Sequence, residues 1–453
     1  MIKIIEITND IRHFCVIFKQ QKNLFMKHLY TTITLIILSL FVGQDVYGQF
    51  KLSGEVRPRP EMFDNGYKTL ANENSKANWV TSQRTRINAD YTMDYMKFKV
   101  TFQDIRNWGE TKTLTENGQY LALHEAWGEI MFNEKFSLKL GRQELVYDDH
   151  RIFGSVAWAQ QARSHDLGLF KYEDEFKLHV GLSFNKYKEG GAVNAAGFNR
   201  AMQYAWFNKS FEKLQLSVLA LNHGTQVVEA GDLIRETNYS QTIGTHLKSK
   251  LGAVSLNGSF YYQMGKDNVS KSIGAYNAAL NASMGVTESI SVLAGLELLS
   301  GSESKRNNAG GVSATSTTDN NSFNPFYGTN HKFNGFMDYF YVGNHGNLSG
   351  LNDFNVGAKW KSGKWNAGLT GHYFMSNANL IDQNDVVQDA GLGTELDLNA
   401  GYKFNNWIAF SGGYSQMFAT ESMEVLKGGS KDVTNNWAYI MITIKPELFN
   451  SSK

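Results

Sequence analysis

Two short stretches of the chain place arginine at every second position, the spacing of side chains on one face of a β-strand. GEVRPRPEMF, residues 54–63, carries Arg57 and Arg59, and RTRINADYTM, residues 84–93, carries Arg84 and Arg86. A guanidinium group keeps its charge at any working pH and binds carboxylates through two parallel hydrogen bonds. If the two stretches are neighbouring strands, the four side chains form one cationic patch whose expected chemistry is the selection of anions.

The elements that must carry these arginines are strands, because apolar and polar side chains alternate along the chain from Phe50 onward. In FKLHVGLSF, residues 176–184, Phe176 and Leu178 share one face while Lys177 and His179 share the other. Soluble sandwiches also alternate, so this pattern alone does not decide the architecture. The strands are predicted at 50–62, 79–93, 96–108, 119–132, 136–147, 161–173, 175–186, 200–210, 213–222, 238–250, 253–264, 271–286, 289–300, 352–361, 364–376, 392–404, 407–420 and 434–446.

The connections between these strands decide the architecture. Long connections such as 63–78, 148–160, 223–237 and 301–351 alternate strictly with tight ones such as Asp94–Tyr95. Outer-membrane barrels have an even number of strands, short periplasmic turns and long extracellular loops. The sequence therefore predicts an all-β fold, a closed antiparallel transmembrane β-barrel of about 18 strands in the outer membrane of a Gram-negative bacterium.

Pro58 and Pro60 fit a barrel strand because they share parity, so their missing N–H groups fall toward one neighbouring strand only. We expect that neighbour to have bent away or ended, near the rim of the barrel. The prolines then face outward and the charged residues of 54–63 face the lumen. Charges facing lipid would cost about 2–4 kcal/mol each at mid-membrane.

Carboxylates near the arginines in sequence leave a second interpretation open. They could neutralise the arginines, which would then only brace the wall, and the two roles are compatible. The candidate carboxylates are Glu55, Glu61, Asp90, Glu125 and Glu129.

Composition excludes several classes of protein. The 453 residues carry a formal net charge of +1, which argues against a nucleic-acid binder, and the single cysteine, Cys15, cannot form an intramolecular disulfide. Outside the N-terminal segment no apolar run reaches about 18 residues, which excludes a multi-helix membrane protein. No cofactor and no metal site are implied.

The N-terminal segment has the features of a secretory signal. MKHLYTTITLIILSLFVGQDVYGQ starts at Met26 and has a basic start, an apolar run over 33–42 and the small residue Gly48 at the expected cleavage site. The apolar run is too short to span a membrane. We expect residues 1–48 to be an upstream extension plus a cleaved signal peptide, with the true start at Met26, and residues 49–453 to form a single barrel domain.

Several motifs resemble the alginate export family of outer-membrane porins. They are KLGRQELVYDDHRIFGSVAWAQQARSHDLGLFKYE at 139–173, LHEAWGEI at 123–130, the strands that contain RPRPE and SQRTRINADY, and FYGTNHKFNGFMDYF at 326–340. The resemblance implies an eighteen-stranded barrel with an arginine-rich constriction that passes an anionic uronic-acid polymer. By position it gives these lumen candidates: Arg57, Arg59, Arg84, Arg86, Arg142, Arg151 and Arg163.

Arg142 fits this assignment poorly. Strict alternation places it outward with Phe136, Leu138 and Leu140, unless a bulge at Gly141 reverses the phase of the strand. Either that bulge exists, or Arg142 lies above the lipid.

The connection 301–351 is too long for a simple loop. Its first half is polar, whereas its second half is rich in Phe and Tyr, which should pack against other residues. We expect it to form a lid or plug over the pore mouth; an outer loop that packs on other loops is the alternative.

Histidine and aspartate residues of YDDHR and RSHD raise the possibility of an enzyme. They are Asp148, Asp149, His150, His165 and Asp166. Their spacing matches no standard zinc signature, and the sequence contains no Gly-x-Ser-x-Gly elbow. We therefore expect no enzyme, and assign these residues to ordering an outer loop or contacting a permeating anion.

The expected function is passive diffusion of anionic solutes, with a uronic-acid-containing oligo- or polysaccharide as the solute, through an arginine-lined lumen. The alternative is a general or structural barrel without polymer selectivity. The expected partners are the anionic saccharide, outer-membrane lipids and the barrel assembly machinery during biogenesis, with no nucleic acid. Aromatic residues expected at the membrane interfaces are Trp79, Trp108, Trp206 and Trp407.

Overall fold

The structure is a computed structural model that describes residues 48–111, 113, 121–187, 199–230 and 232–451. Residues 1–47 of the expected extension and signal segment 1–48 lie outside the described residues. The strands are β1 Gly48–Phe63, β2 Asn78–Met93, β3 Met96–Asn107, β4 Leu121–Met131, β5 Phe136–Gln143, β6 His165–Glu173, β7 Lys177–Phe184, β8 Ala201–Ser210, β9 Leu214–Glu229, β10 Asp232–Leu251, β11 Val254–Lys266, β12 Ser272–Gly285, β13 Ile290–Leu299, β14 Ser304–Arg306, β15 Val312–Ala314, β16 Asp319–Asn320, β17 Leu351–Ser362, β18 Trp365–Met375, β19 Leu380–Ile381, β20 Gly391–Lys403, β21 Ile408–Ala419, β22 Asn435–Ile444 and β23 Glu447–Asn450. The short helices are η2 Asn330–Lys332, α2 Val342–His345 and α3 Glu421–Lys427.

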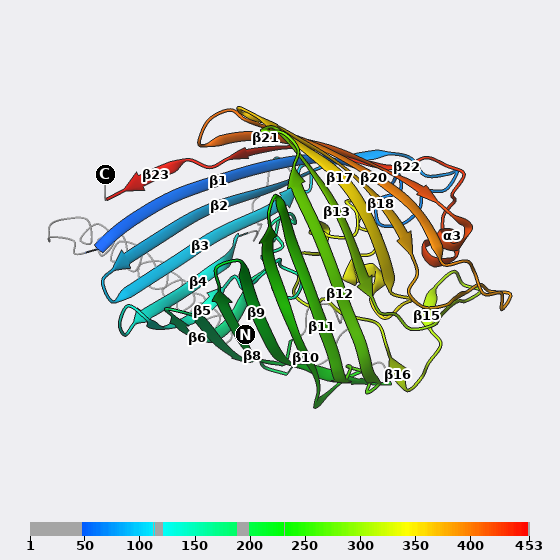
Figure 1. The fold of residues 1–453 in the computed structure, drawn as a ribbon, viewed down its shortest axis with the longest axis horizontal. Coiled ribbons are helices and arrows are strands. Elements are labelled where there is room, and N and C mark those ends of the chain that lie inside the picture. The colour runs from blue at the N-terminus through cyan, green and yellow to red at the C-terminus, as the bar shows by residue number, and fades with distance from the viewer. Residues whose placement is uncertain (1–47, 112, 114–120, 188–198, 231, 452–453) are drawn as a thin grey trace, which may run out of the picture. The chain divides into compact units, whose positions relative to one another are not determined.

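Eighteen strands of the described chain close into an antiparallel barrel (Figure 1). β1 to β13 follow one another in order, then β17, β18, β20, β21 and β22, and β22 pairs with β1. The predicted fold class is therefore confirmed, and each of the eighteen predicted strands corresponds to one of these. β23 continues the pairing along β1, and β16 adds a short parallel pairing to β12.

The tight turns lie where the sequence predicts them. Met93 pairs with Met96 and Ser362 pairs with Trp365, which leaves two-residue turns between the strands. Gly363 has φ +54°, the left-handed conformation that such hairpin turns require. The prediction of a long connection at 223–237 is wrong. β9 and β10 continue through this region as a paired hairpin that reaches Glu229 and Asp232.

Apolar side chains cover the outward face of the strands. Phe98, Leu140, Ile243, Leu280 and Val356 all point away from the lumen and are exposed. An apolar surface that surrounds a closed barrel requires lipid to cover it. Separately, none of the helices within the described residues is long and apolar enough to cross a membrane.

Three of the four tryptophans expected at the interfaces are on the surface. Trp79, Trp108 and Trp407 are each more than half exposed. The prediction that Trp206 lies at a membrane interface is wrong. Trp206 is buried on the lumen side of β8, and its indole N–H donates a hydrogen bond to Asp148 at 3.1 Å. Alternation in β8 gives Trp206 the same face as Met202 and Tyr204, which are buried as well.

The two prolines of β1 lie at the seam that closes the barrel. Val56 pairs with Ile444 and Glu61 pairs with Tyr439 of β22, in one continuous register, yet the described ladder has no pair between these positions. Pro58 and Pro60 occupy the interruption, so their missing N–H groups do face one neighbour only. The expected location near the rim is wrong, because β22 continues past the prolines and pairing resumes.

Two segments fold inward and occupy much of the lumen. We call residues 144–164, between β5 and β6, the inner loop, and residues 301–350, between β13 and β17, the plug segment. Leu145, Ile152 and Phe153 of the inner loop pack with Phe323 of the plug segment in one buried apolar cluster. Met337 and other plug residues form a second cluster against the barrel wall. Burial of these apolar side chains explains why neither segment extends outward as a solvated loop.

Candidate functional site

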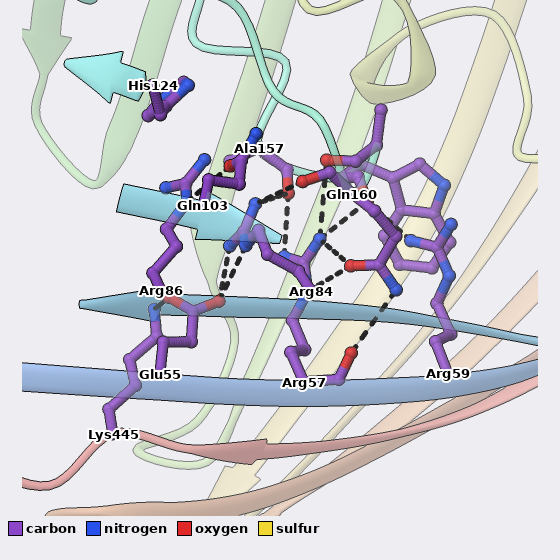
Figure 2. Close-up of polar contacts among 12 residues, drawn as sticks. Glu55, Arg57, Arg59, Arg84, Arg86, Gln103, His124, Ala157, Gln160 and Lys445 are labelled. Atoms are coloured by element: carbon purple, nitrogen blue, oxygen red, sulfur yellow. Dashed lines mark hydrogen bonds and ion pairs between the residues drawn. The ribbon is translucent and has the colours of Figure 1, made fainter. Parts of the chain in front are cut away.

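Arg57 on β1 is the centre of the site that the inner loop forms with the barrel wall (Figure 2). Its guanidinium group donates hydrogen bonds to the carbonyl oxygens of Ala157 at 2.8 Å and Trp158 at 3.1 Å. It also donates to Gln160 Oε1 at 2.8 and 3.1 Å. Each of these acceptors is uncharged, so Arg57 holds the inner loop in place without a direct carboxylate contact of its own.

Arg59 and Arg84 flank Arg57, and each has a carboxylate partner. Arg84 donates to Glu55 at 2.5 and 2.9 Å. Arg59 donates to Glu61 at 2.6 Å and to the Trp158 carbonyl at 2.5 Å. The Arg59 guanidinium also lies 4.1 Å from the centre of the Trp158 ring, a cation–π contact.

Arg86 completes the group without a carboxylate contact. Its Nε donates to Gln103 Oε1 at 2.7 Å, and Gln103 in turn donates to the Gln161 carbonyl at 3.1 Å. Lys445 from the chain's far end adds a further cation, 3.2 Å from Glu55. The wall thus brings together five cations, which are Arg57, Arg59, Arg84, Arg86 and Lys445, around the two carboxylates Glu55 and Glu61.

Arg142 is not a lumen residue. It shares the outward face of β5 with Leu138 and Leu140, and its guanidinium donates to Asp166 at 2.8 Å. The phase of β5 is not reversed at Gly141, since pairing with β4 and β6 runs through without a shift. The bulge of this region lies in β4 at His124, where the register against β3 shifts. Of the two alternatives, the outward position of Arg142 is therefore correct.

Arg151 and Arg163 lie on the inner loop and hold it to the plug segment. Arg151 is buried, forms an ion pair with Glu297 of β13, and lies 3.7 Å from the centre of the Phe333 ring. Arg163 donates to the Gly328 carbonyl at 3.2 Å. Burial lowers the pKa of Arg163. Both arginines connect the two inserted segments and do not line an open channel.

Only some of the five carboxylates expected to neutralise the arginines do so within the described chain. Glu125 pairs with Lys99 at 2.6 Å and Glu129 with Lys171 at 2.5 Å, so these two brace lysines, not arginines. Asp90 lies opposite Lys99 in the β2–β3 ladder. Glu55 and Glu61 are the only two of the five, within the described chain, that pair with arginine.

A group of lumen carboxylates that the sequence reading missed holds the plug segment. Glu395 accepts a hydrogen bond from the Met337 N–H at 2.8 Å, and Asp397 accepts one from the Phe336 N–H at 3.1 Å. Asn334 donates to Asp353 at 3.1 Å. The sequence contains a signal for this group. Alternation in TELDLNA puts Glu395 and Asp397 on one face of the strand, and no basic residue lies nearby in the sequence to pair with them.

The residues considered for catalysis are dispersed. Asp148 bonds Trp206, whereas His165 stacks edge-on against Tyr327 at 4.8 Å. Burial lowers the pKa of His150, and Lys332 and Lys248 lower it further against the opposing effect of Asp149. Across the described ranges, no cluster of three or more histidine, cysteine or acidic side chains could hold a metal ion.

The inserted segments divide the lumen into separate cavities. A cavity of about 1110 Å³ lies on the side of the short turns and reaches the plug residues Lys332 and Phe336. A pocket of about 310 Å³ lies on the side of the long connections. The cavity of about 20 Å³ beside Arg151 and Asn334 is close to the volume of one water. Its lining includes residues of the inner loop, the plug segment and β13.

Acid should loosen the plug segment through Asp338. Tyr67 donates to Asp338 at 2.7 Å and His331 bonds it at 2.9 Å. Burial alone would raise the pKa of Asp338, but His331, Tyr67 and the nearby Lys68 together hold it below the ordinary 3.8. A lowered pKa stabilises the folded state above the unfolded value of about 3.9, and this stabilisation is lost as pH falls below it. Channel conductance should rise between pH 5 and pH 2, and Asp338→Asn should abolish that step.

Comparison with known proteins gives one family match. Residues 49–182 match the model of the alginate export family. This segment contains β2 to β6, nearly all of β1, the whole inner loop and the four arginines at 57, 59, 84 and 86, which with Lys445 form what we call the arginine wall. It confirms the resemblance seen in the sequence. No curated protein matches the chain.

Solved porins share the fold. OccAB4 of Acinetobacter baumannii has a TM-score of 0.59 at 12% identity, with 89% of this chain and 99% of that chain covered. OccK9 (OpdG) of Pseudomonas aeruginosa has a TM-score of 0.56 at 10% identity, with 88% and 98% covered. A BenF-like porin from Pseudomonas fluorescens Pf-5 has a TM-score of 0.56 at 12% identity, with 88% and 99% covered. At these identities the likeness shows the barrel fold.

Proposed function

We propose that this multi-pass barrel of the Gram-negative outer membrane, whose residues 49–182 match the alginate export family of porins, is a channel for passive diffusion of uronic-acid-containing saccharides. The observation that carries the proposal is the surplus of positive charge at the arginine wall. Two carboxylates there face five cations, and Arg57 and Arg86 bind only neutral oxygens. A wall with this surplus favours anions over cations.

The cavity on the short-turn side also presents cationic side chains to a solute. Five lysines line it: Lys213, Lys248, Lys250, Lys332 and Lys359. Of its carboxylates, Glu297 pairs with Arg151, while His372 lies 2.9 Å from Asp353 and 3.6 Å from Asp397. Asp149 and Glu212 are the other acidic residues at this cavity. The five lysines equal the five carboxylates in number, so the lining carries mixed charge, and its lysines are available to contact a passing anion.

Anion selectivity should depend on Arg57 and Arg86. We expect the reversal potential of the purified protein in a planar bilayer under a salt gradient to show anion preference. The double variant Arg57→Gln and Arg86→Gln removes two charges that have no direct carboxylate contact while keeping polar side chains, and should abolish most of that preference. Arg142→Gln removes the same charge from the outer face of the wall and should leave the potential unchanged. Equal potentials for the double variant and the wild type would refute the proposal.

A structural barrel without conduction is the second candidate, because the inner loop and the plug segment pack against each other and against the barrel wall inside the lumen. Proteoliposomes that contain the protein should swell in neutral sugar solutions if the channel conducts. Absence of swelling, together with absence of bilayer conductance, would favour the structural role.

A further inference from the structure

A groove of about 370 Å³ lies on the outer face of the barrel wall, over β7 to β10. Its floor carries the small side chains of Ala205 on β8 and Ala220 on β9, which lie directly opposite each other in the ladder. The flanking strands form its sides with the larger outward residues Val180, Leu182 and Ile243. Neighbouring strands lie about 4.8 Å apart, so a floor of two small rows is wide enough for one extended hydrocarbon chain.

Three amide side chains form a row across this groove, two residues beyond its floor on the side of the long connections. Gln241 donates to Asn222 at 2.8 Å, and Asn222 donates to Gln203 at 2.7 Å. The three residues lie opposite one another in the ladders of β8, β9 and β10, and each is partly exposed. An amide nitrogen carries two N–H groups, and hydrocarbon offers none of them an acceptor. The bonds within the row use one N–H of Asn222 and one of Gln241, so a second N–H of each suits an acceptor on the outer face.

Aromatic rings and a cation lie at the next level toward the long connections. Phe184 on β7 and Tyr239 on β10 occupy the next outward positions and are exposed. Such rings mark the membrane interface of a barrel. The Arg200 guanidinium lies 6.0 Å from the centre of the Phe184 ring and 4.2 Å from the centre of the Tyr187 ring. From this level toward the short turns, the wall therefore presents a cation, then amides, then an apolar groove.

We propose that this groove binds one acyl chain of a phosphate-bearing membrane lipid in the leaflet on the side of the long connections. The phosphate contacts Arg200, the acyl carbonyl accepts hydrogen bonds from Asn222 and Gln241, and the chain lies on Ala205 and Ala220. The order of these groups is that of a lipid, whose charged headgroup lies at the interface, its acyl carbonyl beneath and its hydrocarbon toward the midplane. The groove is continuous with the apolar outer face that lipid covers, so the inference is independent of the solute that passes through the lumen.

A second copy of the chain fits this groove less well than a lipid does. A two-fold axis along the membrane normal would place the groove opposite itself. The two concave floors at Ala205 and Ala220 would then enclose a void, whereas protein interfaces are close-packed. A flexible hydrocarbon chain fills the groove from one side.

Native mass spectrometry of the delipidated full chain, titrated with dioleoyl phosphatidylglycerol, tests the proposal. The wild type should bind the lipid saturably. Ala220→Phe fills the floor with a ring and should weaken this binding about tenfold or more, and Ala220→Leu, a smaller change, should weaken it in the same direction. Ala294→Phe is the matched control, because Ala294 is an exposed outward residue of β13, outside the groove, and it should leave the affinity unchanged. Heat-modified gel mobility checks that each variant is folded.

A diether analogue of the same lipid, which lacks the acyl carbonyls, separates the polar contact from the apolar one. Asn222→Leu should weaken the ester lipid about threefold to tenfold and leave the ether lipid unaffected, whereas Ala220→Phe should weaken both. Equal affinity of the wild type and the folded Ala220 variants would overturn the proposal. A dimer mass that Ala220→Phe abolishes would overturn it as well and identify a second copy of the chain as the occupant.

Discussion

Replacement of Arg151 by methionine should release the plug segment and raise single-channel conductance several-fold. The Arg151 guanidinium forms a buried ion pair with Glu297, lies 3.7 Å from the centre of the Phe333 ring and donates to Asn334 at 3.4 Å. Methionine fills similar space without charge. Glu297 is then left buried without its cation, which typically costs about 3–5 kcal/mol.

Movement of the plug segment relieves that cost, because Glu297 gains water once Asn334 and Phe333 withdraw. A second variant distinguishes this mechanism from a loss of packing. Arg151→Met combined with Glu297→Leu removes both charges, and replacing a buried pair by apolar residues is often neutral. The double variant should return to the closed, low-conductance state. If both variants conduct as the wild type does, the ion pair does not hold the plug.

Gly335→Ala should release the same segment by a different route. Gly335 has φ +84°, and a Cβ atom there would lie 2.6 to 2.7 Å from the carboxylate of Glu395. The left-handed conformation costs about 1–2 kcal/mol with a side chain. The clash adds to this, because Glu395 is fully buried and accepts the Met337 N–H, so it has little room to move.

The measurement is amide hydrogen exchange at Phe336 and Met337, whose N–H groups bond Asp397 and Glu395. Exchange there should accelerate at least tenfold in Gly335→Ala, together with higher conductance. Gly363→Ala is the control: its φ is +54° and no atom lies within 4 Å of the added Cβ. It carries backbone strain alone, at the turn on the opposite end of β17 from the plug segment, and should leave both readouts unchanged. Protection retained in Gly335→Ala would contradict the role given to Glu395.

Sequence alternation predicted the parts of the molecule that depend on strand parity. The shared face of Glu55, Arg57, Arg59 and Glu61 and the eighteen-strand barrel both follow from a two-residue period and from connection lengths. Arg142 shows the limit of transferring a residue's role from a family resemblance. The resemblance assigned it to the lumen, whereas strand parity alone placed it correctly on the outer face of the barrel. β5 has no bulge at Gly141; the register shift nearby lies at His124 of the partner strand β4, where local sequence gives no glycine signal.

The inward folding of the inner loop could not be derived from alternation, because it depends on tertiary contacts. Arg57 has no local reason to bind the carbonyl groups at 157–159 rather than a solute. A signal was nevertheless present: Leu145, Ile152, Phe153 and Trp158 are too apolar for a solvated extracellular loop. The second half of 301–351 gave the same signal, because its Phe and Tyr content predicted packing against other residues.

The interrupted ladder at Pro58 and Pro60 has a consequence for how the cylinder opens and closes. β11 and β12 pair without a break from Val254–Met284 to Lys266–Ser272, whereas β1 and β22 pair at Val56 and at Glu61 alone. Fewer residues pair between β1 and β22 than between β11 and β12, and the rest of this edge of β1 is held by β23 at Lys51, Leu52 and Ser53. We therefore expect the seam between β1 and β22 to close last when the barrel inserts into the membrane. We expect the same seam to separate first when the barrel is under mechanical load.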